Sequence, residues 1–198
     1  MKTWKITAAL VMAAAVIAGT GLPASASEFG ALGTRVTVVR DTTLYAAPGL
    51  STPRVGTAWA GDDTTAYCRQ QDSNGQLMVL GANRPGRNGV QWANTAGFLW
   101  PYDLSGVPTS LLTCTAFAPF QARIDTGLYS APGLSTPRTG TVWAQGRLFA
   151  VCKTLDSNGR RMVLSVGESG RTGVQWANTT GYVADIDIVG STNAVSDC

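Results

Sequence analysis

Histidine is absent from the 198 residues, and charged side chains make up only 14% of them. Without an imidazole, the chain cannot form a Ser–His or Cys–His catalytic set or a zinc site that uses histidine. The four cysteines include no closely spaced pair of the kind that zinc sites use, so we expect no metal and no cofactor. Hydrophobic residues still make up 44% of the chain, which indicates a folded protein rather than a disordered one.

No apolar run reaches the roughly 20 residues that a membrane-spanning helix needs. The apolar run Ile6–Ile17 follows Lys2 and Lys5 and precedes a small-x-small cleavage site. This order is typical of a secretory signal peptide. We therefore expect residues 1–26 to be a cleaved signal peptide, residues 27–30 to be a short extension, and the mature protein to be secreted, either free outside the cell or associated with the cell wall.

The charge balance gives no sign of a nucleic-acid partner. Once Lys2 and Lys5 are removed with the signal peptide, 13 basic residues remain against 12 acidic ones. A nucleic-acid-binding surface would need a clustered basic excess. The basic residues of the mature chain are twelve arginines and a single lysine, Lys153. Because arginine codons are richer in G and C than lysine codons, this bias indicates a GC-rich bacterial source.

The sequence after the signal segment consists of two repeats. Leu44–Arg54 (LYAAPGLSTPR) reappears 84 positions later as Leu128–Arg138 (LYSAPGLSTPR), without a gap. The segment Gly89–Thr95 (GVQWANT) reappears at the same offset. A fixed period of this kind predicts two similar units, residues 31–114 and residues 115–198.

The four cysteines follow the same period, since Cys68 corresponds to Cys152 and Cys114 to Cys198. Four cysteines allow three pairings. Only Cys68–Cys114 together with Cys152–Cys198 closes each repeat on itself, and a unit must be complete before it is duplicated. We therefore predict these two disulfides, which suit the oxidising environment that an exported protein meets.

Each repeat shows a β pattern without a sustained helical period. The strands predicted in the first repeat are Arg35–Arg40, Val55–Ala60, Thr64–Gln70, Gln76–Gly81 and Gly97–Leu104. Between two of them lies Asp72–Gly75 (DSNG), whose Asn-Gly pair provides the positive φ angles of a tight hairpin turn. Proline and glycine residues mark a long loop after the first strand. The fold class is therefore all-β, with each repeat forming a small closed or nearly closed barrel.

At this level of detail the second repeat resembles the bacterial SH3 domain. It has an opening strand, a loop with a small-Pro-small element, a T-G-T-V strand, a hydrophobic strand and a closing G-Y-V, at Leu128–Gly133, Thr139–Val142, Leu148–Cys152 and Gly181–Val183. The first repeat matches the pattern at Gly56–Ala58 and Gly97–Leu99. The resemblance implies two tandem SH3-like barrels. Each repeat departs from the family in a longer loop, Ala82–Asn94 in the first, that carries its own tryptophan.

Aromatic residues that recur in both repeats are the candidates for ligand binding. They are Tyr45, Trp59, Trp92, Tyr129, Trp143 and Trp176. The resemblance implies that Tyr45 and Tyr129 lie in the loop that lines the peptide groove of SH3-like barrels. The resemblance also places the Ala58 side chain toward the interior of the barrel. Strand alternation then turns the adjacent Trp59 side chain outward, and the same rule applies to Trp143 in the second repeat. A core role is the alternative for all six, because aromatic side chains dominate small cores.

Catalysis is not expected. The acidic residues that recur are Asp41, Asp72 and Asp103, with Asp125, Asp156 and Asp187 as their counterparts. Side-chain caps and turns account for such aspartates without an acid/base role. The sequence therefore predicts no catalytic residues and a chain that is not an enzyme.

Two functions remain open. The resemblance implies a secreted binding protein that recognises cell-wall peptidoglycan, either its peptides or its glycans, through two weak sites joined by a short spacer. The alternative is an extracellular protein–protein interaction or inhibitor protein whose partner is another extracellular protein. In both cases we expect a monomer without nucleic acid and without membrane contact after signal cleavage.

Overall fold

A computed structural model describes residues 33–85, 92–168 and 176–198. The predicted signal peptide and the 27–30 extension lie outside these residues. The strands of the first repeat, β1 to β7, are Thr34–Val38, Thr42–Tyr45, Arg54–Ala58, Asp63–Gln71, Leu77–Asn83, Thr95–Leu99 and Leu104–Ser105. Those of the second, β8 to β14, are Pro119–Ala122, Thr126–Tyr129, Arg138–Val142, Arg147–Leu155, Arg161–Gly167, Thr180–Ala184 and Ile188–Val189.

The described residues form no α-helix, which confirms the all-β prediction. Three short 3-10 turns, η1, η2 and η3, occupy Pro101–Asp103, Cys114–Ala116 and Asp185–Asp187. The strand β2 was missed from the sequence. It is four residues long and lies at the start of the segment that the proline and glycine residues mark as a loop.

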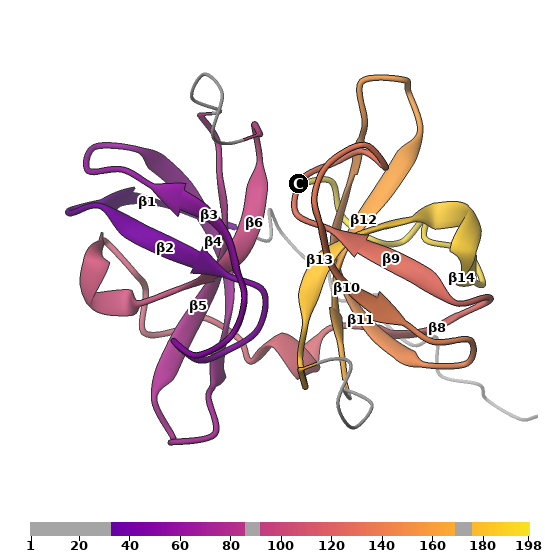
Figure 1. The fold of residues 1–198 in the computed structure, drawn as a ribbon, viewed down its shortest axis with the longest axis horizontal. Helices are drawn as coiled ribbons and strands as arrows, with labels where there is room; N and C mark the ends of the chain where they lie inside the picture. The colour runs from indigo at the N-terminus through magenta and orange to yellow at the C-terminus, as the bar shows by residue number, and fades with distance from the viewer. Residues whose placement is uncertain (1–32, 86–91, 169–175) are drawn as a thin grey trace, which may run out of the picture.

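Each repeat forms one seven-stranded antiparallel sheet with the same strand order. The order is β3-β2-β6-β5-β4-β1-β7 in the first repeat and β10-β9-β13-β12-β11-β8-β14 in the second. Figure 1 shows the two sheets side by side, with β6 and β13 on their inner sides and η2 in the connection between the repeats.

Of the closed or nearly closed barrel predicted for each repeat, the closed form is wrong for the second repeat. Its end strands, β10 and β14, do not pair with each other in the described part of the chain. The strand β14 has only two residues, Ile188 and Val189, and both pair with β8. The other end strand, β10, pairs with β9 alone within the described residues, so the sheet stays open.

The inner strands bury both of their faces. In β5, Val79 packs in the core of the first repeat, with Val36 and Leu99 among its neighbours. Met78 and Leu80, on the opposite face of the same strand, pack in a separate cluster that includes residues of the second repeat. An uninterrupted apolar run such as Met78–Leu80 is what a strand buried on both faces requires.

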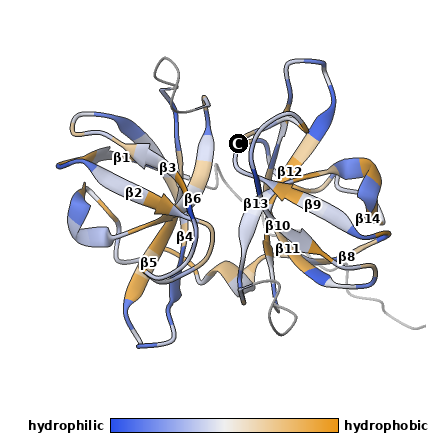
Figure 2. Ribbon diagram, in the orientation of Figure 1, coloured by the Kyte–Doolittle hydropathy of each residue, from blue (hydrophilic) through white to orange (hydrophobic). Residues whose placement is uncertain are grey.

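The cluster between the repeats is a core that both repeats share. Its largest fully buried side chains include Phe98 of β6, Tyr182 of β13 and the two methionines, Met78 and Met162. Phe98 and Tyr182 occupy corresponding positions, so the two repeats meet through the same surface. Figure 2 shows hydrophobic colours on the inner strands β5, β11 and β12 and on the connection that carries η2.

Two reciprocal hydrogen bonds join the repeats at the edge of this core. The backbone N–H of Ala96 donates to the carbonyl of Ser130 at 2.7 Å, and the N–H of Thr180 donates to the carbonyl of Ala46 at 2.7 Å. Ala96 corresponds to Thr180, and Ala46 corresponds to Ser130. The repeats are therefore related by an approximate twofold axis, as in an isologous dimer within one chain.

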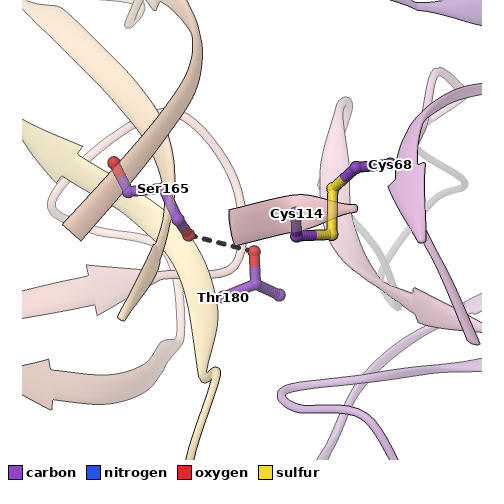
Figure 3. The surroundings of a disulfide bond; sticks show 4 residues. All are labelled: Cys68, Cys114, Ser165 and Thr180. Atoms are coloured by element: carbon purple, nitrogen blue, oxygen red, sulfur yellow. Dashed lines mark hydrogen bonds between the residues drawn. A yellow bond between two sulfur atoms is a disulfide. The ribbon is translucent and has the colours of Figure 1, made fainter. Parts of the chain in front are cut away.

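Both predicted disulfides are present. Cys68 is bonded to Cys114 and Cys152 to Cys198, each across a separation of 46 residues. Cys68, Cys114 and Cys152 are fully buried in the shared core. Figure 3 shows the first disulfide facing β13, where the hydroxyl of Thr180 donates to the carbonyl of Ser165 at 3.1 Å.

Replacing Phe98 by alanine tests whether the repeats unfold as one unit. We expect Phe98→Ala to lower the free energy of unfolding by about 3–5 kcal/mol, because the ring is fully buried. The amide of Thr180, in the other repeat, should lose hydrogen-exchange protection in parallel. Ile186→Ala is the control, since Ile186 is 73% exposed. Unchanged protection at Thr180 would show that the repeats are energetically independent.

Burial of Tyr182 predicts an alkaline limit to stability. Burial raises the pKa of the Tyr182 phenol far above its ordinary value, with a further contribution from Tyr67. Burial also raises the pKa of Tyr67. A raised pKa contributes stability that is complete below the unfolded value, near pH 10, and is lost as the pH rises above it. The variant Tyr182→Phe, which copies Phe98, should lose less unfolding free energy above about pH 10 than the unchanged chain, as measured by denaturant titration.

Candidate binding groove between the repeats

The loop Ala46–Pro53, which joins β2 to β3, is held in one conformation by its own hydrogen bonds. The N–H of Ala46 donates to the carbonyl of Pro53 at 2.8 Å and closes the base of the loop. Inside it, the Thr52 hydroxyl donates to the carbonyls of Ala47 and Gly49, both at 2.8 Å. Thr52 is buried, so its hydroxyl has little access to water. The loop is therefore a formed wall rather than a mobile connection.

The turn between β4 and β5 stands against this loop. Asp72 Oδ1 accepts the N–H groups of Asn74 and Gln76 at 2.8 and 2.7 Å, which forms the expected tight turn. Gly49 has a φ of +125°, and a Cβ placed on it would lie 3.6 Å from Cβ of Asp72. Because Gly49 and Asp72 approach this closely, the loop and the turn act as one surface.

A third wall comes from the second repeat. Trp176, Ala177 and Asn178 precede β13, and the Thr179 hydroxyl donates back to the carbonyl of Trp176. The hydrogen bond from Thr180 to Ala46 fixes this segment beside the loop of the first repeat. The contact between the repeats therefore positions Trp176, which is 47% exposed.

These three segments enclose a groove of about 500 Å³. Its lining residues are Pro48, Gly49, Leu50, Ser51, Thr52, Gln71, Asp72, Ser73, Asn74, Gln76, Trp176, Ala177 and Asn178. The lining offers an aromatic ring, three apolar side chains, several amide and hydroxyl groups and one carboxylate. Among these lining residues, all from the described part of the chain, there is no lysine or arginine. A concave surface that combines apolar groups with a few fixed polar groups is typical of a ligand site.

The structure separates the six candidate aromatic residues into three pairs. Trp176 lines the groove, and Trp92 is 51% exposed at the corresponding place in the first repeat. Tyr45 and Tyr129 are half-buried and pack against the shared core. Trp59 and Trp143 are half-buried directly after β3 and β10, and they do not line the groove.

The expected loop position of Tyr45 and Tyr129 is wrong. Each is the last residue of a strand, and each pairs across the sheet with the ring that fills the shared core: Tyr45 with Phe98, and Tyr129 with Tyr182. Both tyrosines pack against the shared core, and neither lines the groove.

The recurring aspartates have structural partners. Asp41 accepts the N–H of Ala60 at 2.8 Å, and Asp103 accepts hydrogen bonds from Arg40 and Thr42. Away from the groove, the Arg35 hydrogen bond lowers the pKa of Asp63. Within residues 33–85, 92–168 and 176–198, no three Cys, Asp or Glu side chains are grouped so as to hold a metal ion.

Several residues that line the groove were not predicted from the sequence. Leu50, Gln71 and Gln76 were not among the candidates, although Leu50 lies in the longest segment that the two repeats share. The near identity of this loop in both repeats was the available signal. It could not show that the loop faces the other repeat.

No protein-family model and no curated protein matches the chain. The solved structures that align with it include NlpC2 and NlpC1 from Trichomonas vaginalis. NlpC2 is 12% identical, with 80% of this chain and 48% of that chain covered and a TM-score of 0.28. NlpC1 is 13% identical, with 84% and 49% covered and a TM-score of 0.28. The chain thus spans about half the length of each.

Removing the Thr52 hydroxyl tests the rigidity of the groove wall. We expect Thr52→Val to cost about 1 kcal/mol of unfolding free energy, because the carbonyls of Ala47 and Gly49 lose the buried hydroxyl as a hydrogen-bond donor. The amide of Thr52, which donates to the Gly49 carbonyl at 3.2 Å, should exchange faster with solvent. Thr136→Val should behave alike, since its hydroxyl makes the corresponding bonds, and Ser51→Ala is the exposed control. Equal exchange rates in Thr52→Val and the unchanged chain would contradict a hydroxyl-held loop.

Proposed function

We propose that this chain is a secreted, non-catalytic binding protein with tandem repeats of the bacterial SH3 type. Its groove between the repeats recognises an uncharged part of cell-wall peptidoglycan, either glycan or peptide. The observation that carries the proposal is the groove itself, in which the exposed Trp176 ring lies beside the polar edge of the Asp72–Gln76 turn.

The groove lining suits a sugar or a peptide better than a charged ligand. An exposed indole ring offers a flat apolar face, on which a sugar ring or an apolar side chain can stack with little loss of conformational freedom. The amides of Gln71, Asn74, Gln76 and Asn178 supply both donors and acceptors. These groups match the hydroxyl and amide groups of a glycan or a peptide backbone.

The tandem arrangement gains a specific role in this proposal. A single repeat supplies the loop and the turn, while the wall at Trp176–Asn178 comes from the other repeat. Two repeats are therefore needed for one complete groove. This differs from two independent sites on a flexible spacer, because the shared core and the reciprocal hydrogen bonds hold the repeats together.

Two structural features support an extracellular location. The chain contains two disulfides, and bonds of this kind persist in oxidising compartments. None of the helices in the described part of the chain has the length and apolar character to cross a membrane. A protein released from the cell would meet peptidoglycan directly.

Sedimentation with isolated bacterial cell walls tests the proposal. The unchanged chain should sediment with the walls, and Trp176→Ala should bind about tenfold more weakly, as expected for the loss of a stacked ring. Tyr102→Ala is the matched control, because Tyr102 is 76% exposed and does not line the groove. Full recovery of the unchanged chain in the supernatant would overturn the proposal and favour an extracellular protein partner.

A further inference from the structure

The approximate twofold axis generates a second surface that corresponds to the groove. We call it the Trp92 surface; it consists of Trp92–Asn94, Pro132–Thr136 and Leu155–Arg160. The hydrogen bond from Ala96 to Ser130 brings the first two segments together. A Cβ on Gly133 would lie 3.9 Å from Cβ of Asp156, so the second segment also packs on the third.

The Trp92 surface differs from the groove in charge. Gln76, which lines the groove, corresponds to the exposed Arg160, and Gln71 corresponds to Leu155, which is 62% exposed. The rest of each surface is nearly the same in sequence, including Trp92, which is 51% exposed. The second surface therefore adds a guanidinium and an apolar side chain to the same aromatic platform.

The carboxylate on this surface does not neutralise Arg160. Asp156 is only 8% exposed, and its Oδ1 atom already accepts the N–H groups of Asn158 and Arg160 at 2.9 and 2.8 Å. Within residues 33–85, 92–168 and 176–198, the Arg160 guanidinium forms no ion pair. The positive charge is available to a ligand.

At another pair of corresponding positions the two repeats also carry opposite charges, and there each charge has a structural partner. Arg147 and Glu168 form an ion pair at 3.1 Å, and their counterparts are Asp63 and Arg84, with the two signs reversed. The interaction of Arg84 with Asp63 again lowers the pKa of that carboxyl. There the change of sign on one strand is matched on its neighbour. Arg160 has no opposite charge paired with it within the described residues, so an ion pair within the fold does not account for its charge.

We propose that the Trp92 surface is a second binding site, which takes an anionic group beside a sugar ring or apolar side chain. The Arg160 guanidinium binds the carboxylate or phosphate of the ligand, and the Trp92 ring stacks on the neighbouring ring or side chain. This inference extends the proposed function, because the groove takes an uncharged part of the wall polymer and the Trp92 surface takes an acidic part. The β4–β5 turn and the β11–β12 turn point to opposite sides in Figure 1, so the two sites face different ligands or distant parts of one polymer.

Indole N–H signals of Trp92 and Trp176 in the full mature chain allow each site to be followed separately by NMR. The probes are N-acetylglucosamine, N-acetylmuramic acid and N-acetylglucosamine 6-phosphate, which share a ring and differ in charge. Either acidic sugar should shift Trp92 more than the neutral sugar does, and added salt should weaken this effect. The comparison of the two acidic sugars identifies carboxylate or phosphate as the preferred group.

Exchanging the two counterpart residues gives the decisive variants. Arg160→Gln should weaken binding of the acidic sugar at Trp92 by about tenfold or more, whereas Gln76→Arg should create acidic-sugar binding at Trp176. Both positions are exposed, so neither change should alter the unfolding free energy. The inference is overturned if Arg160→Gln leaves the acidic-sugar affinity unchanged, or if neither acidic sugar shifts Trp92.

Wall sedimentation separates this inference from the proposed function. If the unchanged chain sediments with walls and Arg160→Gln still binds the acidic sugar normally, the proposed function stands and the anionic site is refuted. If the unchanged chain fails to sediment while the Arg160-dependent shift at Trp92 persists, the anionic site stands and its ligand lies elsewhere than in the wall.

Discussion

Burial of the inner faces of β4–β6 and β11–β13 against each other is the constraint on which the rest of the structure depends. A small sheet covers one face with its own end strands and leaves the other exposed to water, and here that second face carries Met78, Leu80 and Phe98. Each such side chain removed from water contributes about 1.5–3 kcal/mol, so the free energy favours a partner sheet of matching shape. Duplication supplied that partner within the same chain. The disulfides add to the effect, because three of their four cysteines are buried in the same layer.

Docking of the sheets also decides where ligands can bind. The hydrogen bonds from Thr180 to Ala46 and from Ala96 to Ser130 each involve the first residue of a long loop as acceptor. The first bond holds the segment before β13 against the β2–β3 loop, and the second holds the segment before β6 against the β9–β10 loop. The loops are already rigid, since Thr52 and Thr136 hold them from inside. A rigid loop and an aromatic ring from another repeat give a site that is formed before a ligand arrives, which reduces the entropic cost of binding.

Once both repeats were needed for the fold, their surfaces could diverge within limits. The interaction between neighbouring strands restricts Asp63 and Arg84 on one side and Arg147 and Glu168 on the other, because reversing one charge alone would place like charges together. Gln76 and Arg160 lie in turns, where no strand neighbour imposes a partner. Turn residues are therefore the positions at which two otherwise similar sites can acquire different ligands.

The sequence by itself determined the all-β class, the two repeats, both disulfides and the tight turn at Asp72–Gly75, because each depends on local chemistry or on the repeat period. It also singled out Trp176 as a candidate ring. It did not reveal the short strand β2, the open second sheet or the place of Tyr45 and Tyr129, and it did not reveal the groove. An uninterrupted apolar run such as Met78–Leu80 shows that both faces of a strand are apolar, but it does not show what covers the second face. Only the tertiary structure decided that, because the cover is another sheet 84 residues further along the chain, and the groove exists only where the two meet.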